Sequence, residues 1–340
     1  MTPHFPEKSP EDPMHTDITT FQPNQNVSDV YLVRDCQLRT TKTGKYYLHL
    51  VLGDRTGAVN GRMWDATEAL FAALNGARFV RVGGRVEVYR EALQLIVHNI
   101  RAVKADEVDA SEFLPTTKRD VDEMFAKLKK LATTVENPHL AQLVDAFLSD
   151  ETFAAKFKKA PAAVSYHQPF LGGLLEHTLT VTELADIIAT RYPQLDRDLL
   201  IAGCILHDIG KVDELAYESN FEYTDRGRLI GHLIIAVEAV RDRVRDIDGF
   251  PEHLFDLLSH LILSHHGEHE WGSPKLPMTA EAFALHHLDN LDAKVEASSR
   301  AIEADNLGGG NWTEFNRMFQ RRLYRGPGAG EPDGDDADAS

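Results

Sequence analysis

The 340-residue sequence lacks any apolar run near the roughly 20 residues that a membrane-spanning helix needs. Cysteine is scarce, because Cys36 and Cys204 are the two in the whole chain and lie far apart. This excludes a disulfide framework and predicts reduced thiols. The N-terminus, with prolines among charged residues, lacks the apolar core of a signal peptide. We therefore expect a cytoplasmic protein with no membrane partner.

A general excess of positive charge, which helps a protein bind nucleic acid, is also missing, since the net charge is −17. The charge is uneven, however. Residues 27–104 hold 12 Lys/Arg against 7 Asp/Glu, a net charge of +5, so the remainder carries −22. This distribution is typical of a basic module on an acidic body. The hydrophobic fraction of 43% indicates a folded chain, and its length predicts two or three domains.

Residues 27–105 alternate apolar and polar side chains with the period of two that β-strands show. Strands are expected near residues 30–33, 46–52, 58–64, 78–89 and 93–103, with a short helix at 66–74. Gly83-Gly84 predicts a bulge or a sharp bend. Five strands with a helix between the third and fourth are the order of an OB-fold barrel.

The two faces of the predicted strands differ in chemistry. Leu48, Leu50 and Leu52 share one face and are expected in the barrel core. The residues that we expect to contact nucleic acid here are Tyr47, Arg62 and Trp64 on the other face, and Lys45 in the preceding turn. Bases stack on rings while Lys and Arg follow phosphates, so this face suits single-stranded nucleic acid. Packing against another domain explains the same pattern equally well.

The rest of the chain is predicted to be helical, so the fold class is multidomain α+β. Residues 115–160 carry apolar stripes at helical spacing and are interpreted as a helical linker between two domains. Residues 162–325 are expected to form an all-α domain, with glycines rather than strands between its elements. Residues 1–25 and 326–340 are predicted to be a disordered arm and a disordered acidic tail.

The candidate site centres on His207-Asp208, at the end of the apolar helical run 199–206. Of the 16 histidines, 11 lie at or after His167. Further candidate ligands are His177, His232, His265, His266 and Asp289. Imidazole and carboxylate suit Mn²⁺, Fe²⁺, Co²⁺ or Zn²⁺, whereas a structural zinc site usually includes cysteine. So many groups exceed the needs of one ion, and a carboxylate shared by two ions accounts for them. Asp292 is expected to orient a ligand instead.

The spaced pattern His177 … His207-Asp208 … Asp289 resembles the HD superfamily of metal-dependent phosphohydrolases. Segments 52–57 and 63–68 in the barrel region, and segments 223–232, 263–274 and 288–294, extend the likeness. Over residues 27–320 the chain resembles the YhaM-type 3′–5′ exoribonucleases. The resemblance implies a bacterial cytoplasmic enzyme that uses Mn²⁺ or a similar ion. Such an enzyme trims single-stranded RNA, and often single-stranded DNA, from the 3′ end to nucleoside monophosphates.

The resemblance also assigns the ligands to two sites. Site one takes His177, His207, Asp208 and Asp289, and site two takes His232, His265 and His266, with Asp208 shared. Three-metal relatives carry a glutamate where this chain has Gly173, so two ions are expected. A homo-oligomer is a separate expectation. Lys211, one turn beyond Asp208, is expected to stabilise transition-state charge, or alternatively to form a salt bridge with Glu214. Arg228, placed on the same helix face as His232, is a weaker candidate for binding phosphate.

Two other functions fit the sequence. One is an HD phosphohydrolase of small nucleotides, in which the barrel regulates activity or mediates oligomerisation. The Gly-Tyr-Pro signature of the cyclic-dinucleotide branch is absent, and the chain reads Trp271-Gly272-Ser273-Pro274 after His266. The other is a single-strand-binding protein with an inactive helical domain. Such a relic is expected to lose ligands, and this chain retains the full set.

Overall fold

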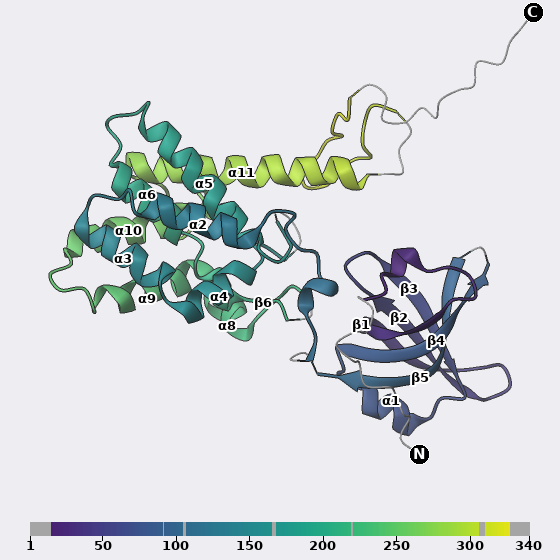
Figure 1. Cartoon of the computed structure of the whole chain (residues 1–340). Helices are drawn as coiled ribbons and strands as arrows, with labels where there is room; N and C mark the ends of the chain where they lie inside the picture. The colour runs from purple at the N-terminus through teal and green to yellow at the C-terminus, as the bar shows by residue number, and fades with distance from the viewer. Residues whose placement is uncertain are drawn as a thin grey trace, which may run out of the picture. The chain divides into compact units, whose positions relative to one another are not determined.

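A computed structural model describes residues 15–90, 92–104, 107–164, 168–218, 220–305 and 310–326. The chain divides into two compact units (Figure 1). The first comprises Met1–Lys118 with Ala216–Glu222, and the second comprises Arg119–Leu215 with Tyr223–Ser340. Among the described residues, no helix combines the length and the apolar character that spanning a bilayer requires.

The first unit is a closed barrel of five strands in the order β1-β2-β3-β5-β4. Its strands are β1 (Asn26–Thr40), β2 (Tyr46–Gly53), β3 (Ala58–Trp64), β4 (Phe79–Tyr89) and β5 (Ala92–Val103). Helix α1 (Glu68–Leu74) lies between β3 and β4 in the chain, and β3 pairs with β5 in parallel. This is the OB-fold topology, so the prediction from strand order is confirmed.

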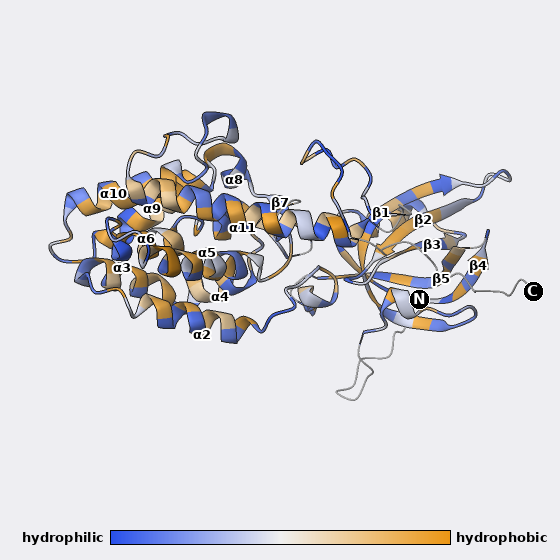
Figure 2. Cartoon of the chain, turned by 90° about the horizontal axis from the view of Figure 1, so that it is seen from above, coloured by the Kyte–Doolittle hydropathy of each residue, from blue (hydrophilic) through white to orange (hydrophobic). Residues whose placement is uncertain are grey.

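Strand alternation builds the barrel core. Leu48, Leu50 and Leu52 on β2 are completely buried, as their shared parity predicts. Figure 2 shows apolar and polar residues alternating along the strands. The pairing of β4 with β5 shifts register between Gly83 and Gly84, which confirms the predicted irregularity. The opposite face of β2 and β3 is thereby left to polar and aromatic side chains.

Part of the predicted N-terminal arm belongs to the barrel unit, so that prediction is wrong for residues 15–25. Ile18 lies in a short 3₁₀ helix (Ile18–Thr20), and both Ile18 and Phe21 are buried in the barrel core. The Ile18 backbone N–H donates to Asp54 Oδ2 at 2.6 Å, and His15 Nε2 lies 3.2 Å from the same oxygen. The sequence hid this because the anchor consists of a few scattered contacts without periodicity. Residues 1–14 lie outside the described part.

The second unit is built from helices. They are α2 (Val121–Ala132), α3 (Pro138–Leu148), α4 (Glu151–Lys159), α5 (Gly173–Ala189), α6 (Arg197–Leu206), α7 (Lys211–Glu214), α8 (Asp225–Ile230), α9 (His232–Val244), α10 (Glu252–Ser264) and α11 (Ala280–Ala304). Helix α6 lies at the centre because every residue from Leu199 to Leu206 is buried. Helices α3, α5, α10 and α11 pack around it.

Two predictions for this region need correction. Helices α2 to α4 are not a separate linker, because they are part of the second unit and pack on α5, α6 and α9. Strands do occur after residue 162, because β6 (Leu215–Ala216) pairs with β7 (Glu222–Tyr223). Two-residue strands leave no periodic signal in a sequence. The predicted tail from residue 326 lies outside the described residues apart from its first position.

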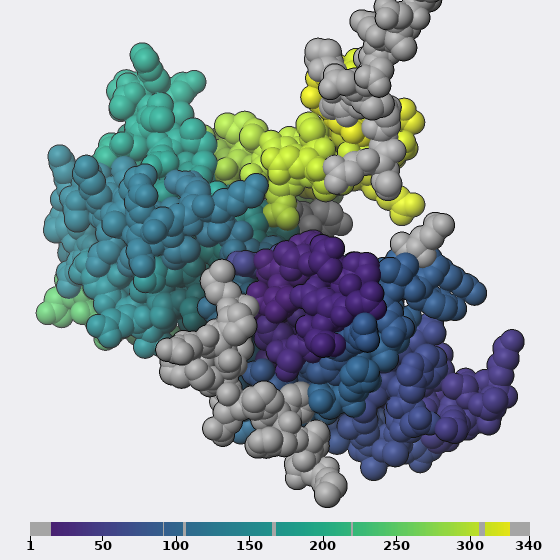
Figure 3. Space-filling model, turned by 45° about the vertical axis from the view of Figure 1, so that its right-hand side comes forward, coloured from purple at the N-terminus to yellow at the C-terminus, as the bar shows by residue number. Residues whose placement is uncertain are grey.

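Helix α11 is the longest element of its unit, with 25 residues. Its N-terminal part is buried at Ala282, Leu285 and Leu288, whereas Leu291 and Val295 farther along are exposed. Its C-terminal part projects beyond the other helices of the unit, as the yellow-green segment shows (Figures 1 and 3). The buried part of α11 therefore carries the residues that take part in the site.

Candidate metal centre

The candidate ligands lie mainly at helix ends, where neighbouring side chains can turn toward one point. His207 caps the C-terminus of α6, and Asp208 follows in the next turn. His232 begins α9, and His265 caps the C-terminus of α10. Because α6 is apolar on all sides, it fixes the His207-Asp208 pair inside the unit. His177 and Asp289 come from within α5 and α11.

A glycine permits the close approach of α9 to this point. Gly210 lies against the backbone of His232, and a Cβ atom at residue 210 would fall 2.1 Å from the His232 carbonyl oxygen. A larger residue would therefore displace the start of α9. Asp208 lies two residues before Gly210 in the chain. Gly210 thus helps to bring His232 close to Asp208.

The imidazoles form two groups. One contains His177 and His207 with Asp289, and the other contains His232, His265 and His266, while His207, Asp208 and His265 form a set that joins the two. In each group, one ligand atom per residue lies within 4.8 Å of the others. In the first group, His177 Nε2 lies 3.1 Å from Asp289 Oδ1 and 3.2 Å from His207 Nε2. The division matches the two predicted ligand sets.

Asp208 lies between the two groups and presents one carboxylate oxygen to each. Its Oδ2 is 3.4 Å from His207 Nε2 and 3.7 Å from His177 Nε2. Its Oδ1 is 3.5 Å from both His232 Nε2 and His265 Nε2. A carboxylate oriented in this way is suited to bridge two cations.

Three of the imidazoles are oriented by backbone carbonyls. The Nδ1–H groups of His207, His265 and His266 face the carbonyl oxygens of Cys204, Ile262 and Trp271, at 2.8, 2.8 and 3.0 Å. A carbonyl only accepts hydrogen bonds, so each of these Nδ1 atoms carries the proton. The Nε2 lone pair of each ring is therefore directed toward the site, as metal ligation requires.

The other two imidazoles are oriented by carboxylates. His177 Nδ1 lies 2.7 Å from Asp292 Oδ2, as predicted from the spacing of Asp292. His232 Nδ1 lies 2.9 Å from Glu214 Oε1, which also accepts the His232 backbone N–H at 2.9 Å. Sequence reasoning missed this role of Glu214. A carboxylate behind an imidazole fixes its tautomer and makes it a stronger ligand.

The donor set fits cations on several counts. Asp208 Oδ1 and His232 Nε2 are buried and have no hydrogen-bond partner among the described residues. Burial lowers the pKa of His265, and it lowers the pKa of His266 to about 3, so these rings are neutral and free to ligate at neutral pH. Burial opposes protonation of His177 too, but Asp289 and Asp292 raise its pKa to about 10. The cluster thus contains an excess of negative charge that a cation would balance.

Lys211 contacts this cluster directly. Its Nζ donates to Asp208 Oδ2 at 2.6 Å, and both side chains are buried. Burial opposes the charge of Asp208, but Lys211 and His207 hold the pKa of that carboxyl well below its usual range. The alternative prediction of a salt bridge between Lys211 and Glu214 is wrong, because Glu214 contacts His232 instead.

The predicted nucleic-acid residues of the barrel gather on one face. Tyr47 and Trp64 are cross-strand partners with ring centroids 5.3 Å apart. The Arg62 guanidinium lies 5.8 Å from the Trp64 ring and 5.1 Å from the Tyr89 ring. Lys45 is ion-paired with Asp65 at 2.9 Å. Sequence reasoning missed Tyr89, which is an aromatic residue at the end of β4 and therefore a detectable signal.

Arg228 lies in the helical unit, in α8, and its guanidinium is 5.9 Å from the Tyr223 ring. The prediction that it shares a helix face with His232 is wrong. Gly231, with φ at +79°, separates α8 from α9, so the two residues belong to different helices. Glycine adopts this left-handed conformation without steric cost, which is why the helix breaks there.

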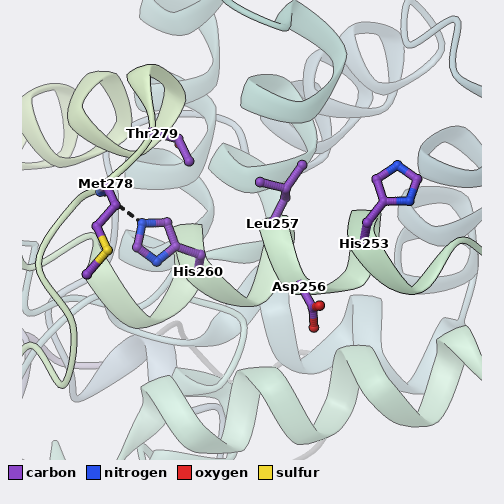
Figure 4. A pocket seen from close by; sticks show the side chains of 6 residues that line it. All are labelled: His253, Asp256, Leu257, His260, Met278 and Thr279. Carbon is purple, nitrogen blue, oxygen red and sulfur yellow. Dashed lines mark hydrogen bonds between the residues drawn. The ribbon is translucent and has the colours of Figure 1, made fainter.

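A shallow cavity of about 390 Å³ lies elsewhere in the helical unit (Figure 4). It is lined by His253, Asp256, Leu257, His260, Met278 and Thr279. His260 Nε2 accepts the Met278 backbone N–H at 3.0 Å, so the lone pair of that nitrogen is already in use. None of the lining residues belongs to the two imidazole groups, so this cavity is separate from the candidate centre.

The fold and the site together define a class: an HD-type metal-dependent phosphohydrolase preceded by an OB-fold barrel. The HD domain family matches residues 174–294. The 3′–5′ exoribonuclease YhaM of Bacillus subtilis is 37% identical over 311 residues, which cover 91% of this chain and 98% of that protein. YhaM of Listeria monocytogenes is 35% identical over 92% of this chain and 100% of its own length. The chain belongs to the YhaM family of 3′–5′ exoribonucleases.

Solved structures resemble the two units separately. The second OB-fold domain of replication protein A from Methanococcus maripaludis is 23% identical, with a TM-score of 0.22, over 27% of this chain and 96% of that one. The HD domain of phosphodiesterase PgpH from L. monocytogenes is 18% identical, with a TM-score of 0.30, over 45% of this chain and 80% of that one. The barrel assignment depends on its own strand order rather than on these scores.

Proposed function

We propose that this protein removes nucleotides from the 3′ end of single-stranded RNA by metal-dependent hydrolysis, releasing nucleoside monophosphates. Membership of the YhaM family supports the reaction, because the relatives are named 3′–5′ exoribonucleases. The single observation that carries the mechanism is Asp208, whose two oxygens face two separate imidazole groups. Single-stranded DNA, with the same phosphodiester, is a second expected substrate.

Two divalent cations would be held by His177, His207 and Asp289 on one side and by His232, His265 and His266 on the other, with Asp208 shared. Mn²⁺ is the proposed ion because the family resemblance implies it, and Fe²⁺, Co²⁺ and Zn²⁺ also accept imidazole and carboxylate ligands. Such a pair supplies an activated water and neutralises phosphate oxygens. The chain itself keeps the rings in the correct tautomer.

Lys211 contributes a fixed positive charge. Its ammonium group donates to Asp208, and the side chain is buried. We propose that it stabilises negative charge as it develops on the phosphate, because a preorganised charge in a buried site needs no reorganisation during the reaction. Arg228, exposed on α8, is retained as a weaker candidate for binding phosphate.

The barrel is proposed to hold the strand whose end is cleaved. Tyr47, Trp64 and Tyr89 offer rings for stacking, and Arg62 offers a cation for phosphate. Lys45 is the weakest of the predicted contacts, since Asp65 already pairs with it. Both cysteines are free thiols, which supports the proposed cytoplasmic location.

A homo-oligomer is proposed on a separate observation. The segment after α11 exposes four large apolar side chains, Trp312, Phe315, Met318 and Tyr324. Clustered exposed apolar residues are typical of protein interfaces. Size-exclusion chromatography with light scattering tests the assembly, and a monomer at micromolar concentration would contradict it.

The decisive experiment uses 5′-labelled single-stranded RNA with Mn²⁺ and, separately, with chelator. A descending ladder that requires metal is expected, whereas intact RNA alongside cleaved small nucleotides would favour the small-nucleotide phosphohydrolase. Arg62→Ala should weaken RNA binding and flatten its salt dependence, because fewer counterions are released. Arg245→Ala is the matched control, since it removes the same charge at the opposite end of α9 from His232.

A further inference from the structure

Trp271 forms an exposed aromatic surface attached directly to the second imidazole group. It closes a 3₁₀ turn (His269–Trp271), and its carbonyl oxygen accepts the His266 Nδ1–H at 3.0 Å. Its side chain is nevertheless 50% exposed. The residue that orients a ligand imidazole through its backbone thus leaves half of its indole open to solvent.

A second contact fixes the indole. The His286 ring lies 6.0 Å from it, centroid to centroid, and the His286 Nδ1–H donates to the His265 carbonyl at 2.8 Å. His286 is buried, and Gly267 packs so closely on it that a Cβ atom there would lie 2.1 Å from the ring. The Trp271 backbone is thus linked to His266, and its indole packs near a ring that is linked to His265.

The reaction determines which part of the substrate adjoins the metal centre. In 3′–5′ cleavage the phosphate that is attacked is the 5′ phosphate of the terminal nucleotide, so the terminal sugar and base adjoin it. Bases stack on exposed rings whatever their identity. The Lys294 ammonium group also lies 5.7 Å from the indole centroid and adds a cation beside a polyanionic substrate.

We infer that Trp271 is the stacking surface for the 3′-terminal nucleobase of the strand being cleaved. This inference depends on the proposed function for the kind of substrate, and it adds a binding group to the metal centre. A purely structural indole that only covers His286 would support the site for every substrate alike. A stacking indole acts on substrates that carry a base.

The first test measures binding without cleavage. Calorimetric titration in Mn²⁺ compares a nucleoside 5′-monophosphate with ribose 5-phosphate, which lacks the base. Wild-type protein should bind the nucleotide roughly 5- to 150-fold more tightly, the range expected for one stacked base. Trp271→Ala should abolish this preference, and Trp271→Phe should retain most of it.

The second test measures cleavage of two 5′-labelled RNAs that differ in whether the 3′-terminal residue carries a base or is abasic. Trp271→Ala should lower kcat/KM for the ordinary RNA by a similar factor and leave the abasic RNA nearly unchanged. Tyr192→Ala is the matched control, since Tyr192 is an aromatic residue 53% exposed in the segment after α5, and it should leave the preference intact. Metal content and Tm are recorded for each variant.

The outcomes separate the two hypotheses. An equal loss of kcat/KM for both RNAs in Trp271→Ala would overturn the inference in favour of a structural role. Loss of bound metal in this variant would do the same. A wild-type protein that binds both small ligands equally would also overturn it. If wild-type protein left RNA intact but Trp271→Ala lost the nucleotide preference, the exonuclease assignment would fail while the stacking surface stood.

Discussion

Replacing Asp208 by asparagine tests the centre most directly, because it keeps the shape of the side chain and removes its charge. Asp208 Oδ2 accepts from Lys211 Nζ at 2.6 Å, and both side chains are buried. Removing one partner of a buried ion pair costs about 3–5 kcal/mol, because the other charge is left without compensation. Asp289 and Glu214 also favour the charged form of Lys211, so the lower end, about 3 kcal/mol, is expected in metal-free protein.

A loss of about 3 kcal/mol leaves a protein of ordinary stability folded, since total stabilities are about 5–15 kcal/mol. The double variant Asp208→Asn with Lys211→Met should recover most of the loss, because no unpaired charge remains. It should recover neither metal binding nor activity, because both imidazole groups still lack their shared carboxylate. Urea unfolding of chelator-treated protein, metal analysis after dialysis against Mn²⁺ and the RNA ladder measure the three effects.

Asp213→Asn is the matched control for this series. Asp213 pairs with Lys156 at 2.8 Å, but both side chains are about half exposed, so the change should cost no more than about 1 kcal/mol. If Asp208→Asn cost equally little, the Lys211 ammonium would not be desolvated as the structure indicates. If the variant retained two ions and near-normal turnover, Asp208 would not be the shared ligand.

Three further variants and one pH series probe other contacts. Lys211→Ala should lower turnover by roughly 10²–10³-fold with both ions still bound, and unchanged turnover or loss of the bound ions would contradict a role in the transition state. Glu214→Gln should weaken metal affinity by roughly 10–100-fold, measured by competition with a chelating dye, and an unchanged affinity would argue against the carboxylate's role. Trp64→Ala should cost about 1–3 kcal/mol of single-strand binding by fluorescence anisotropy while cleavage of a dinucleotide is spared, and parallel losses would exclude a strand-holding barrel face. Burial disfavours the charge of His15, but its carboxylate partners raise its pKa to about 9, so its contribution to stability is complete below pH 6.5 and is lost as pH rises through about 9. Asp54 has a pKa lowered to about 2, chiefly by its hydrogen bonds against the opposing effect of burial, so its contribution is present above pH 3.8 and is lost as pH falls through about 2. Thermal unfolding measured across pH checks both predictions. If His15→Gln lost stability at alkaline pH just as the wild-type protein does, the prediction for His15 would be refuted.

Periodicity predicted the barrel well because each strand has one buried face. The burial of Leu48, Leu50 and Leu52 and the helix between the third and fourth strands follow from parity and order alone. The same reasoning missed the anchoring of residues 15–25, because backbone N–H groups that donate to the buried carboxylates of Asp29 and Asp54 leave no pattern in the sequence. It also predicts that the helices of residues 115–160 are a linker outside the helical domain, since an apolar stripe does not show what it packs against.

Within the site, residue types and spacing identified the ligands but not the contacts behind them. Glu214 was assigned to Lys211 because i,i+3 spacing on a helix permits that pair. The structure instead brings Glu214 to His232, 18 residues away, which no local rule foresees. Arg228 was misplaced for a related reason, because the helix was extended through Gly231. The backbone conformation of Gly231 ends α8 and sets the direction of α9.

The five oriented imidazoles have a consequence for how strongly and how selectively the centre binds metal ions. Each ring is oriented by an Nδ1 contact with a carbonyl or carboxylate of the chain itself. Ordering a free side chain on binding costs about 0.5–1.5 kcal/mol, so a preorganised set of five avoids several kcal/mol of entropy loss at the moment of capture. A preorganised set of ligands adapts poorly to ions of different size. Ionic radius and preferred coordination geometry, rather than affinity for nitrogen alone, should then decide which cation from the cellular pool remains bound.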